Sequence, residues 1–187
     1  CVFCELKLAT LNFSSFEEFS NVDRSMPKSE PKTLNFETFN QKWGSLETFG
    51  TSGELVTFSF AEQNYEQQFN SFDFFIQEEN FQREITQALT AWENISNIRF
   101  TFVPDAHEVD IRFGWRNIDG EQGILGSTTI PSSGPLENVI VAFDRSEKWF
   151  LDGDSPPNQI DFSSTAIHEI GHAIGIGHSS SPTALMN

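Results

Sequence analysis

Cysteine and tyrosine are scarce in this chain of 187 residues, which contains two cysteines and a single tyrosine. Because both cysteines, Cys1 and Cys4, lie at the very start, no disulfide bond can crosslink the rest of the chain. A Cys-x-x-Cys pair can be redox-active or form half of a zinc site. No second pair follows, however, and no β-α-β pattern surrounds it, so we interpret the pair as a terminal remnant.

Lysine and arginine are scarce as well. Eleven basic residues stand against 27 acidic ones, which gives a formal net charge of −16. Binding to a nucleic-acid backbone requires clustered basic side chains, so the charge argues against a nucleic-acid partner. An acidic surface is compatible with a secreted protein, with a calcium-binding protein, or with an ordinary soluble surface.

Long apolar stretches are missing too. No run of about 18 apolar residues occurs, so the sequence predicts no membrane span. The chain does not begin with methionine, and residues 1–10 lack a basic segment followed by a long apolar stretch, so no intact signal peptide is visible. This start is compatible with a processed form or a fragment.

The composition changes near residue 50. In residues 1–50 phenylalanine, serine, asparagine and glutamate alternate irregularly and prolines interrupt them, so we interpret this part as a weakly structured leader or pro-region. Hydrophobic residues make up 37% of the chain, which is ordinary for a protein that builds a core. We assign that core to one domain over residues 51–187.

Hydrophobic patterns in this domain predict two helices and several strands. Residues 79–95 are predicted to form a helix, because their apolar residues recur at helical spacing. The face concerned comprises Ile85, Ala88, Leu89, Trp92 and Ile95. A second helix is predicted over about 164–174, with Ser163 or Ser164 as its cap and Gly175 at its end. Strands are predicted at 55–60, 98–103, 109–113, 124–130 and 138–143, an order that implies an α/β or α+β layer structure.

Three of the four histidines lie in and just after the second helix, in the sequence HEIGHAIGIGH that starts at residue 168. His168 and His172 are four apart, so a helix places them about 40° apart on one face, where both reach one metal ion. Gly175 tolerates the left-handed backbone that ends a helix, so the chain can turn back and bring His178 to the same ion. Three protein ligands leave a fourth position for water, which is typical of catalytic zinc.

Glu169 adjoins the first of these ligands and is predicted to be the general base. Zinc lowers the pKa of its bound water toward about 7. Glu169 can accept a proton from that zinc-bound water, leave hydroxide to attack a carbonyl, and pass the proton to the leaving amine. These parts suit peptide hydrolysis. The alternative is a helix with ordinary hydrogen-bonded histidines, although only His107 lies outside the motif, in a loop where we expect it to be exposed.

The pattern HExxHxxGxxH followed by a methionine resembles the metzincin zinc peptidases. Met186 matches the turn that lies beneath the zinc site in that family, and Ser179 with Pro182 resembles the matrixin branch rather than the serralysins. Segments 42–44 and 56–60 are similar to bacterial members of the matrixin–serralysin clan. The resemblance implies an α+β zincin-like fold, with a twisted, mostly parallel five-stranded sheet and two long helices. It also implies a monomeric, secreted metallopeptidase that cleaves polypeptides, including those of the extracellular matrix.

A second part of the resemblance concerns calcium. Residues 119–125 resemble the matrixin loop DGxGGxL, and residues 143–147 resemble the family's FDxxE. In the family these two pieces bind a structural calcium ion, so the resemblance implies an oxygen shell suited to Ca²⁺. Its ligands would be the side chains of Asp119, Asp144 and Glu147 and the backbone carbonyls of Gly120, Gln122 and Ile124. The alternative is two ordinary acidic turns.

Other family features bear on the substrate and on a second metal. The resemblance places Leu125 and Gly126 on the edge strand of the sheet, where an extended substrate would pair with the backbone. The family's second, structural zinc is predicted to be absent, because poor ligands stand at the matching positions, Arg112, Gly114, Ser127 and Ala142. Residues 1–50 also lack the family's Pro-Arg-Cys-Gly inhibitory motif.

Three functional hypotheses remain open from the sequence. The first is a secreted zinc endopeptidase. The second is a non-enzymatic, calcium-stabilised binding module that keeps the motif as scaffold, although a pure scaffold has no need of Glu169. The third is a serralysin-type peptidase with calcium-binding repeats beyond residue 187. Since family members continue past Met186 into a wall of the specificity pocket, we expect the chain to be truncated there.

Overall fold

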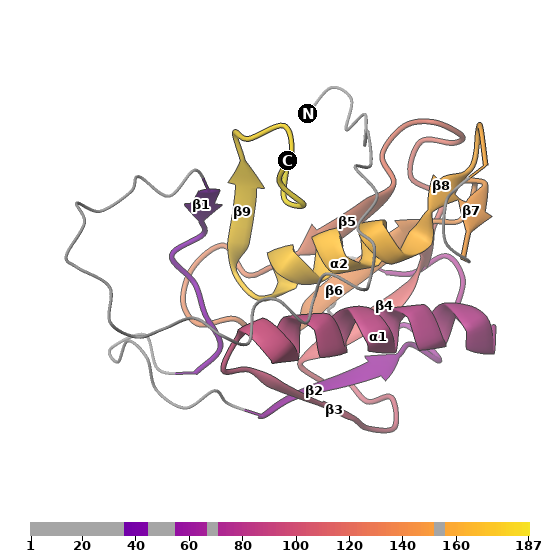
Figure 1. Ribbon diagram of the computed structural model, residues 1–187. Coiled ribbons are helices and arrows are strands. Elements are labelled where there is room, and N and C mark those ends of the chain that lie inside the picture. Colours follow the sequence, from indigo (N-terminus) through magenta and orange to yellow (C-terminus); the bar gives the residue numbers. More distant parts are fainter. Residues whose placement is uncertain (1–35, 45–54, 67–70, 152–155) are drawn as a thin grey trace.

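A computed structural model describes residues 36–44, 55–66, 71–151 and 156–187 of the chain (Figure 1). Within these ranges, two helices lie in front of a five-stranded sheet and pack against each other. The helices are α1 (Glu79–Ile95) and α2 (Phe162–Ala173). This architecture confirms the predicted α+β fold with two long helices.

The sheet is mostly parallel, as predicted. Four strands run parallel, and the fifth runs antiparallel at one edge. In spatial order the strands are β3 (Arg99–Phe102), β2 (Leu55–Phe60), β4 (Ile111–Arg116), β6 (Val139–Asp144) and β5 (Gly126–Thr129). Two small sheets accompany it: β1 (Phe36–Thr38) pairs with β9 (Ile176–Ser179), and β7 (Trp149–Phe150) pairs with β8 (Ile160–Asp161).

Strand β6, which lies between β4 and β5, is buried on both faces, which explains its continuous apolar sequence. Val139, Val141 and Phe143 belong to the main core beneath the helices. Ile140 and Ala142 alternate with them and belong to a second apolar cluster. The strand is therefore fixed in register, because a slip by one residue would exchange the two faces.

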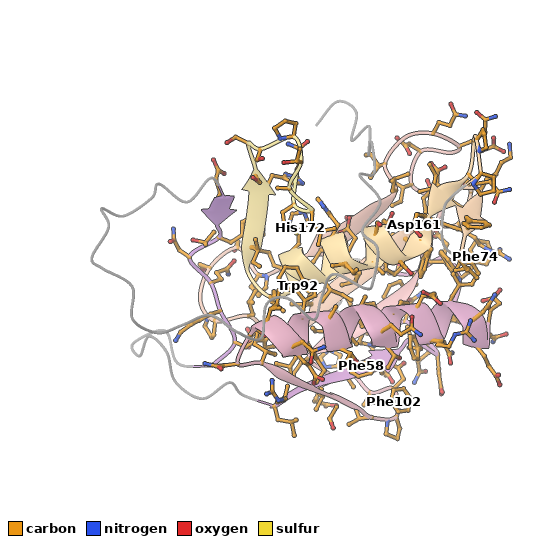
Figure 2. All side chains as sticks on the ribbon, in the orientation of Figure 1. Phe58, Phe74, Trp92, Phe102, Asp161 and His172 are labelled. Atoms are coloured by element: carbon orange, nitrogen blue, oxygen red, sulfur yellow. The ribbon has the colours of Figure 1, made fainter. Side chains whose placement is uncertain are left out.

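The predicted core face of α1 is confirmed except at its last residue. Ile85, Ala88, Leu89 and Trp92 are buried, and the Trp92 indole donates a hydrogen bond to the carbonyl of Ile167 at 2.9 Å, which joins the two helices (Figure 2). Ile95 is 65% exposed, and it is the last residue of the helix. Glu84, which is not among the residues of the predicted apolar face, is also buried and accepts a hydrogen bond from the Ser163 hydroxyl.

The second helix begins two residues earlier than predicted. Its cap is Asp161 (Figure 2), whose carboxylate accepts the Ser164 backbone N–H at 3.0 Å, and not one of the two serines. Phe162 is fully buried and makes an edge-on contact with Phe81 of α1, which anchors the first turn. The predicted end is confirmed, since Gly175 has a φ of +95°.

Strand β4 runs past its predicted end at residue 113 to Arg116. Gly114 does not interrupt the strand. A Cβ at that position would collide with the ring of Phe72, so the glycine allows this ring to pack flat against the sheet.

Residues 36–44 contact the domain, although the sequence assigned them to a weakly structured leader. The Phe39 N–H donates to the carbonyl of Gly175 at 3.1 Å, and the Trp43 indole donates to the carbonyl of Ala173 at 3.0 Å. The Gln41 amide donates to the carbonyl of Pro131 at 2.9 Å. The first two bonds reach the end of α2 and the turn that follows it, and the third reaches the segment after β5. The rest of the predicted leader, including Cys1 and Cys4, lies outside the described residues.

Neither helix in the described part of the chain is long and apolar enough to cross a membrane.

Candidate metal centre

The three histidines of the motif converge on one point. His168 and His172 belong to α2, from which His172 projects in Figure 2, and His178 belongs to β9, after the chain reverses at Gly175. One ring nitrogen from each lies within 4.8 Å of the others, and no other such group of potential metal ligands occurs among the described residues. The Nε2 atoms of His172 and His178 are 3.2 Å apart.

Backbone carbonyls orient two of these rings. The Nδ1 atom of His168 lies 2.8 Å from the carbonyl oxygen of Leu185, and that of His172 lies 2.8 Å from that of Ile176. Because a carbonyl can only accept, both Nδ1 atoms donate, and each neutral ring keeps its Nε2 lone pair for a metal ion. The roles of Leu185 and Ile176 could not be predicted from the sequence, because every residue type has a backbone carbonyl.

Burial also keeps these two histidines neutral. Loss of solvent lowers the pKa of His172 to about 4, although the bond to Ile176 opposes the shift. Loss of solvent likewise lowers the pKa of His168. Neutral imidazoles with converging lone pairs are the form that binds zinc, so the donor set fits a zinc ion with three protein ligands.

Met186, which the resemblance assigns to the family's turn, packs against α2. Its side chain is buried, and a Cβ added to Gly171 would approach Met186 Cε within 2.8 Å. Gly171 therefore leaves room for the methionine against the helix turn between the first two histidines. The Ser179 N–H donates to the carbonyl of Met186, and the Asn187 amide donates back to the carbonyl of Ser179 at 3.0 Å. These bonds join the turn to β9.

Glu169 is buried beside the histidines, with only 6% of its surface exposed. Burial raises the pKa of its carboxyl group to about 7, and a hydrogen bond from Thr128 opposes this rise. A carboxyl group that titrates near neutral pH can both accept and return a proton, as general acid–base catalysis requires. The sequence pointed to Glu169 but not to Thr128, which is 41 residues away in the chain.

The edge strand β5 passes next to Glu169. Gly126, predicted to contact the substrate, begins this strand, and a Cβ at this position would lie only 2.8 Å from Glu169 Cγ. Leu125 immediately precedes the strand, and its carbonyl accepts the Asp144 N–H at 2.9 Å. Among the strands that the structure describes, β5 has a neighbour on one side only, so Gly126 lies on the edge strand as predicted, whereas Leu125 lies just before it.

The two segments predicted to bind calcium also lie together. Both Asp119 and Gly120 donate their backbone N–H groups to Asp144 Oδ2, at 3.0 and 3.2 Å. Glu147 Oε1 accepts the Gly123 N–H at 3.1 Å. Burial acts to raise the pKa of Asp144, but the backbone N–H groups of Ser146, Asp119 and Gly120 hold it below its usual value. The predicted carboxylates thus bind the backbone of the loop that contains Gln122 and Ile124.

The positions that match the family's second zinc site lie on three adjacent strands. Arg112 of β4 is buried in an ion pair with Asp105 at 2.6 Å. Gly114 lies under the Phe72 ring, and Ala142 of β6 packs in the same apolar cluster as Phe72. Ser127 is on β5.

Comparison with known proteins agrees with this geometry. The family model described as Matrixin matches residues 51–187. The chain is 33% identical to Matrix metalloproteinase-C of Caenorhabditis elegans over 122 residues, which cover 59% of this chain and 20% of that protein. It is 33% identical to Metalloendoproteinase 1 of Glycine max over 121 residues, 58% of this chain and 38% of that protein. It is 35% identical to Matrix metalloproteinase-16 of Rattus norvegicus over 118 residues, 56% of this chain and 19% of that protein. Each alignment thus spans well under half of the relative's length.

Proposed function

Because the chain belongs to the matrixin family of peptidases, we propose that it is a zinc-dependent endopeptidase that hydrolyses peptide bonds in extracellular proteins. The observation that carries this proposal is the convergence of three imidazole nitrogens next to a buried carboxyl group. Zinc, when bound, supplies a Lewis acid that polarises a carbonyl and makes water more acidic. A binding module that kept only the scaffold would not need the carboxyl group in that position.

Each residue then has a distinct task. His168, His172 and His178 would hold the ion through Nε2. Glu169 would accept a proton from water and return it to the nitrogen of the leaving amine, which balances the proton over one cycle. Gly126, at the start of the edge strand, would pair with the backbone of an extended substrate. The position of this strand beside Glu169 supports such a role, since the bound peptide would then lie next to the base.

Loss of one histidine tests the zinc site. Loss of a residue that only hydrogen-bonds a metal ligand lowers metal affinity by about 10- to 100-fold. His172→Ala removes a predicted ligand itself, so we expect a larger loss of zinc affinity. It should also abolish cleavage of a quenched peptide library. His107→Ala is the matched control, because His107 is exposed and lies outside the motif, and it should keep both properties. Zinc content after dialysis and cleavage with and without a zinc-selective chelator are the measurements. Cleavage by the parent protein that no chelator affects would contradict the proposal.

We also propose a structural calcium ion bound by Asp119, Asp144 and Glu147 together with carbonyls of the 119–124 loop. The adjacency of the two segments and the burial of the Asp144 carboxylate support it. Binding would require the loop to turn carbonyls toward Asp144 in place of the amides that now donate to it.

Calcium should therefore raise the melting temperature. At a concentration about 100-fold above Kd the gain is about 2.7 kcal/mol, which corresponds to about 5–10 °C for a domain of this size. Glu147→Gln is expected to remove this gain. Glu121→Gln, in the same loop but half-exposed and paired with Lys148, should retain it. An equal calcium response in parent and Glu147→Gln proteins would rule out the assigned ligands.

The organisation of the whole protein is a further proposal. Residues 1–50 would be a leader or pro-region and 51–187 the catalytic domain. The protein would act as a secreted monomer on polypeptides, including those of the extracellular matrix. Family membership supports these assignments, and detection of the protein in the culture medium or in the cells of its source would test the location.

A further inference from the structure

The hydroxyl group of Thr128 contacts both the carboxyl group and the backbone carbonyl of Glu169. It lies 2.7 Å from Oε2 of the carboxyl group and 2.9 Å from the backbone oxygen of the same residue. The Thr128 hydroxyl thus lies within hydrogen-bond distance of both the carboxyl group and the backbone carbonyl of Glu169. A hydroxyl has a single proton, and a carboxylate accepts it more strongly than a carbonyl does, so the shorter bond is the one to Oε2.

The other carboxyl oxygen points toward a different part of the same strand. A Cβ built on Gly126 would lie 2.9 Å from Oε1. Residues two apart on a strand project to the same face, so Gly126 and Thr128 both face Glu169. The glycine provides space for one oxygen, and the threonine binds the other.

We propose that Thr128 is a positioning residue for the general base, because its hydroxyl binds Oε2 and leaves Oε1 to receive and return the proton. This inference rests on the proposed function. The proton moves from water to Oε1 and later from Oε1 to the leaving nitrogen, while Oε2 accepts the Thr128 hydroxyl in both states. Thr128 thus neither gains nor loses a proton. The strand expected to bind the substrate also sets the direction of the base.

A second threonine provides a matched comparison. Thr57 donates to Asp110 Oδ2 at 2.7 Å, which is the same length as the bond from Thr128 to Glu169. Thr57 lies on β2, two strands away from β6 and three from β5 in the sheet order. A variant without the Thr57 hydroxyl therefore loses the same kind of threonine–carboxylate hydrogen bond, but at a site away from Glu169.

The test compares Thr128→Val, Thr128→Ser and Thr57→Val in the zinc-loaded protein. Thr128→Val keeps the shape of the side chain and is expected to lower kcat by about 10- to 100-fold, because a misdirected group costs that much, with KM within about twofold. Thr128→Ser should restore kcat to within about threefold of the parent, and Thr57→Val should leave kcat unchanged. A crystal structure of Thr128→Val should show Glu169 in more than one conformation.

Either of two kinetic results would overturn the inference. The first is an unchanged kcat in Thr128→Val, and the second is an equal loss in Thr128→Val and Thr128→Ser. A parent protein without chelator-sensitive cleavage would instead refute the proposed function. In that case the crystal structures test the positioning role of Thr128. A single, unchanged conformation of Glu169 in Thr128→Val would refute that role.

Discussion

Replacement of Glu169 by glutamine is expected to lower kcat/KM for peptide cleavage by about 10²- to 10⁴-fold, which is the usual contribution of a general base. Glutamine has nearly the same size and can still accept the Thr128 hydroxyl through its amide oxygen, but it cannot take a proton from water. The three histidines remain in place, so the zinc content should stay equal to that of the parent. Zinc analysis and cleavage kinetics on the same preparation are the measurements.

A buried carboxyl group elsewhere controls for packing effects of this change. Glu84 of α1 is 7% exposed, close to the 6% of Glu169, and it accepts a hydrogen bond from Ser163. Glu84→Gln is expected to keep cleavage near the level of the parent. If Glu169→Gln cleaves as fast as Glu84→Gln, the proton acceptor is not Glu169.

Replacement of Gly175 by alanine is expected to cause the largest loss of zinc affinity outside the ligands. Gly175 has a φ of +95°, and an added Cβ would collide with the backbone carbonyl of Gln41. The turn between α2 and β9 must then shift, which moves His178 away from His172. We expect a loss of about 2–4 kcal/mol in the free energy of unfolding and a drop of about 10- to 100-fold in zinc affinity, as for a misplaced ligand.

Gly134→Ala is a control that distinguishes the backbone strain of a positive φ from the collision with Gln41. Gly134 also has a positive φ, +87°, but no atom lies within 4 Å of an added Cβ. Gly134→Ala should therefore cost only the backbone strain, about 1 kcal/mol, and leave zinc binding unchanged. Denaturant unfolding and zinc titration of both variants measure the difference. Equal zinc affinity in the two variants would show that the Gly175 turn does not position His178.

Local patterns were enough to predict much of the fold and the histidine cluster. The strand at 55–60 and the helix at 79–95 have the predicted limits, because each has one clear period along the chain. His168 and His172 are one helical turn apart, and Gly175 marks the reversal that brings in His178. All the information needed lies within eleven residues, from 168 to 178.

Contacts between distant segments were not predictable in the same way. Thr128 reaches Glu169 from another strand, and no spacing in the sequence links the two residues. The cap of α2 was misassigned because Asp161 and the serines after it are all capping residue types, and only the backbone geometry distinguishes them. The length of β4 was underestimated because a glycine usually weakens a strand, whereas Gly114 here accommodates the ring of Phe72.

The contacts of residues 36–44 constrain any maturation of the protein. Phe39 and Trp43 donate hydrogen bonds to the carbonyls of Gly175 and Ala173, at the reversal between His172 and His178. Cleavage at the composition boundary near residue 50 would detach these donors and leave both carbonyls to solvent. Cleavage before residue 36 would keep them. A processed form that keeps both hydrogen bonds would begin upstream of β1, so we propose that residues 36–44 of the predicted leader stay with the catalytic domain.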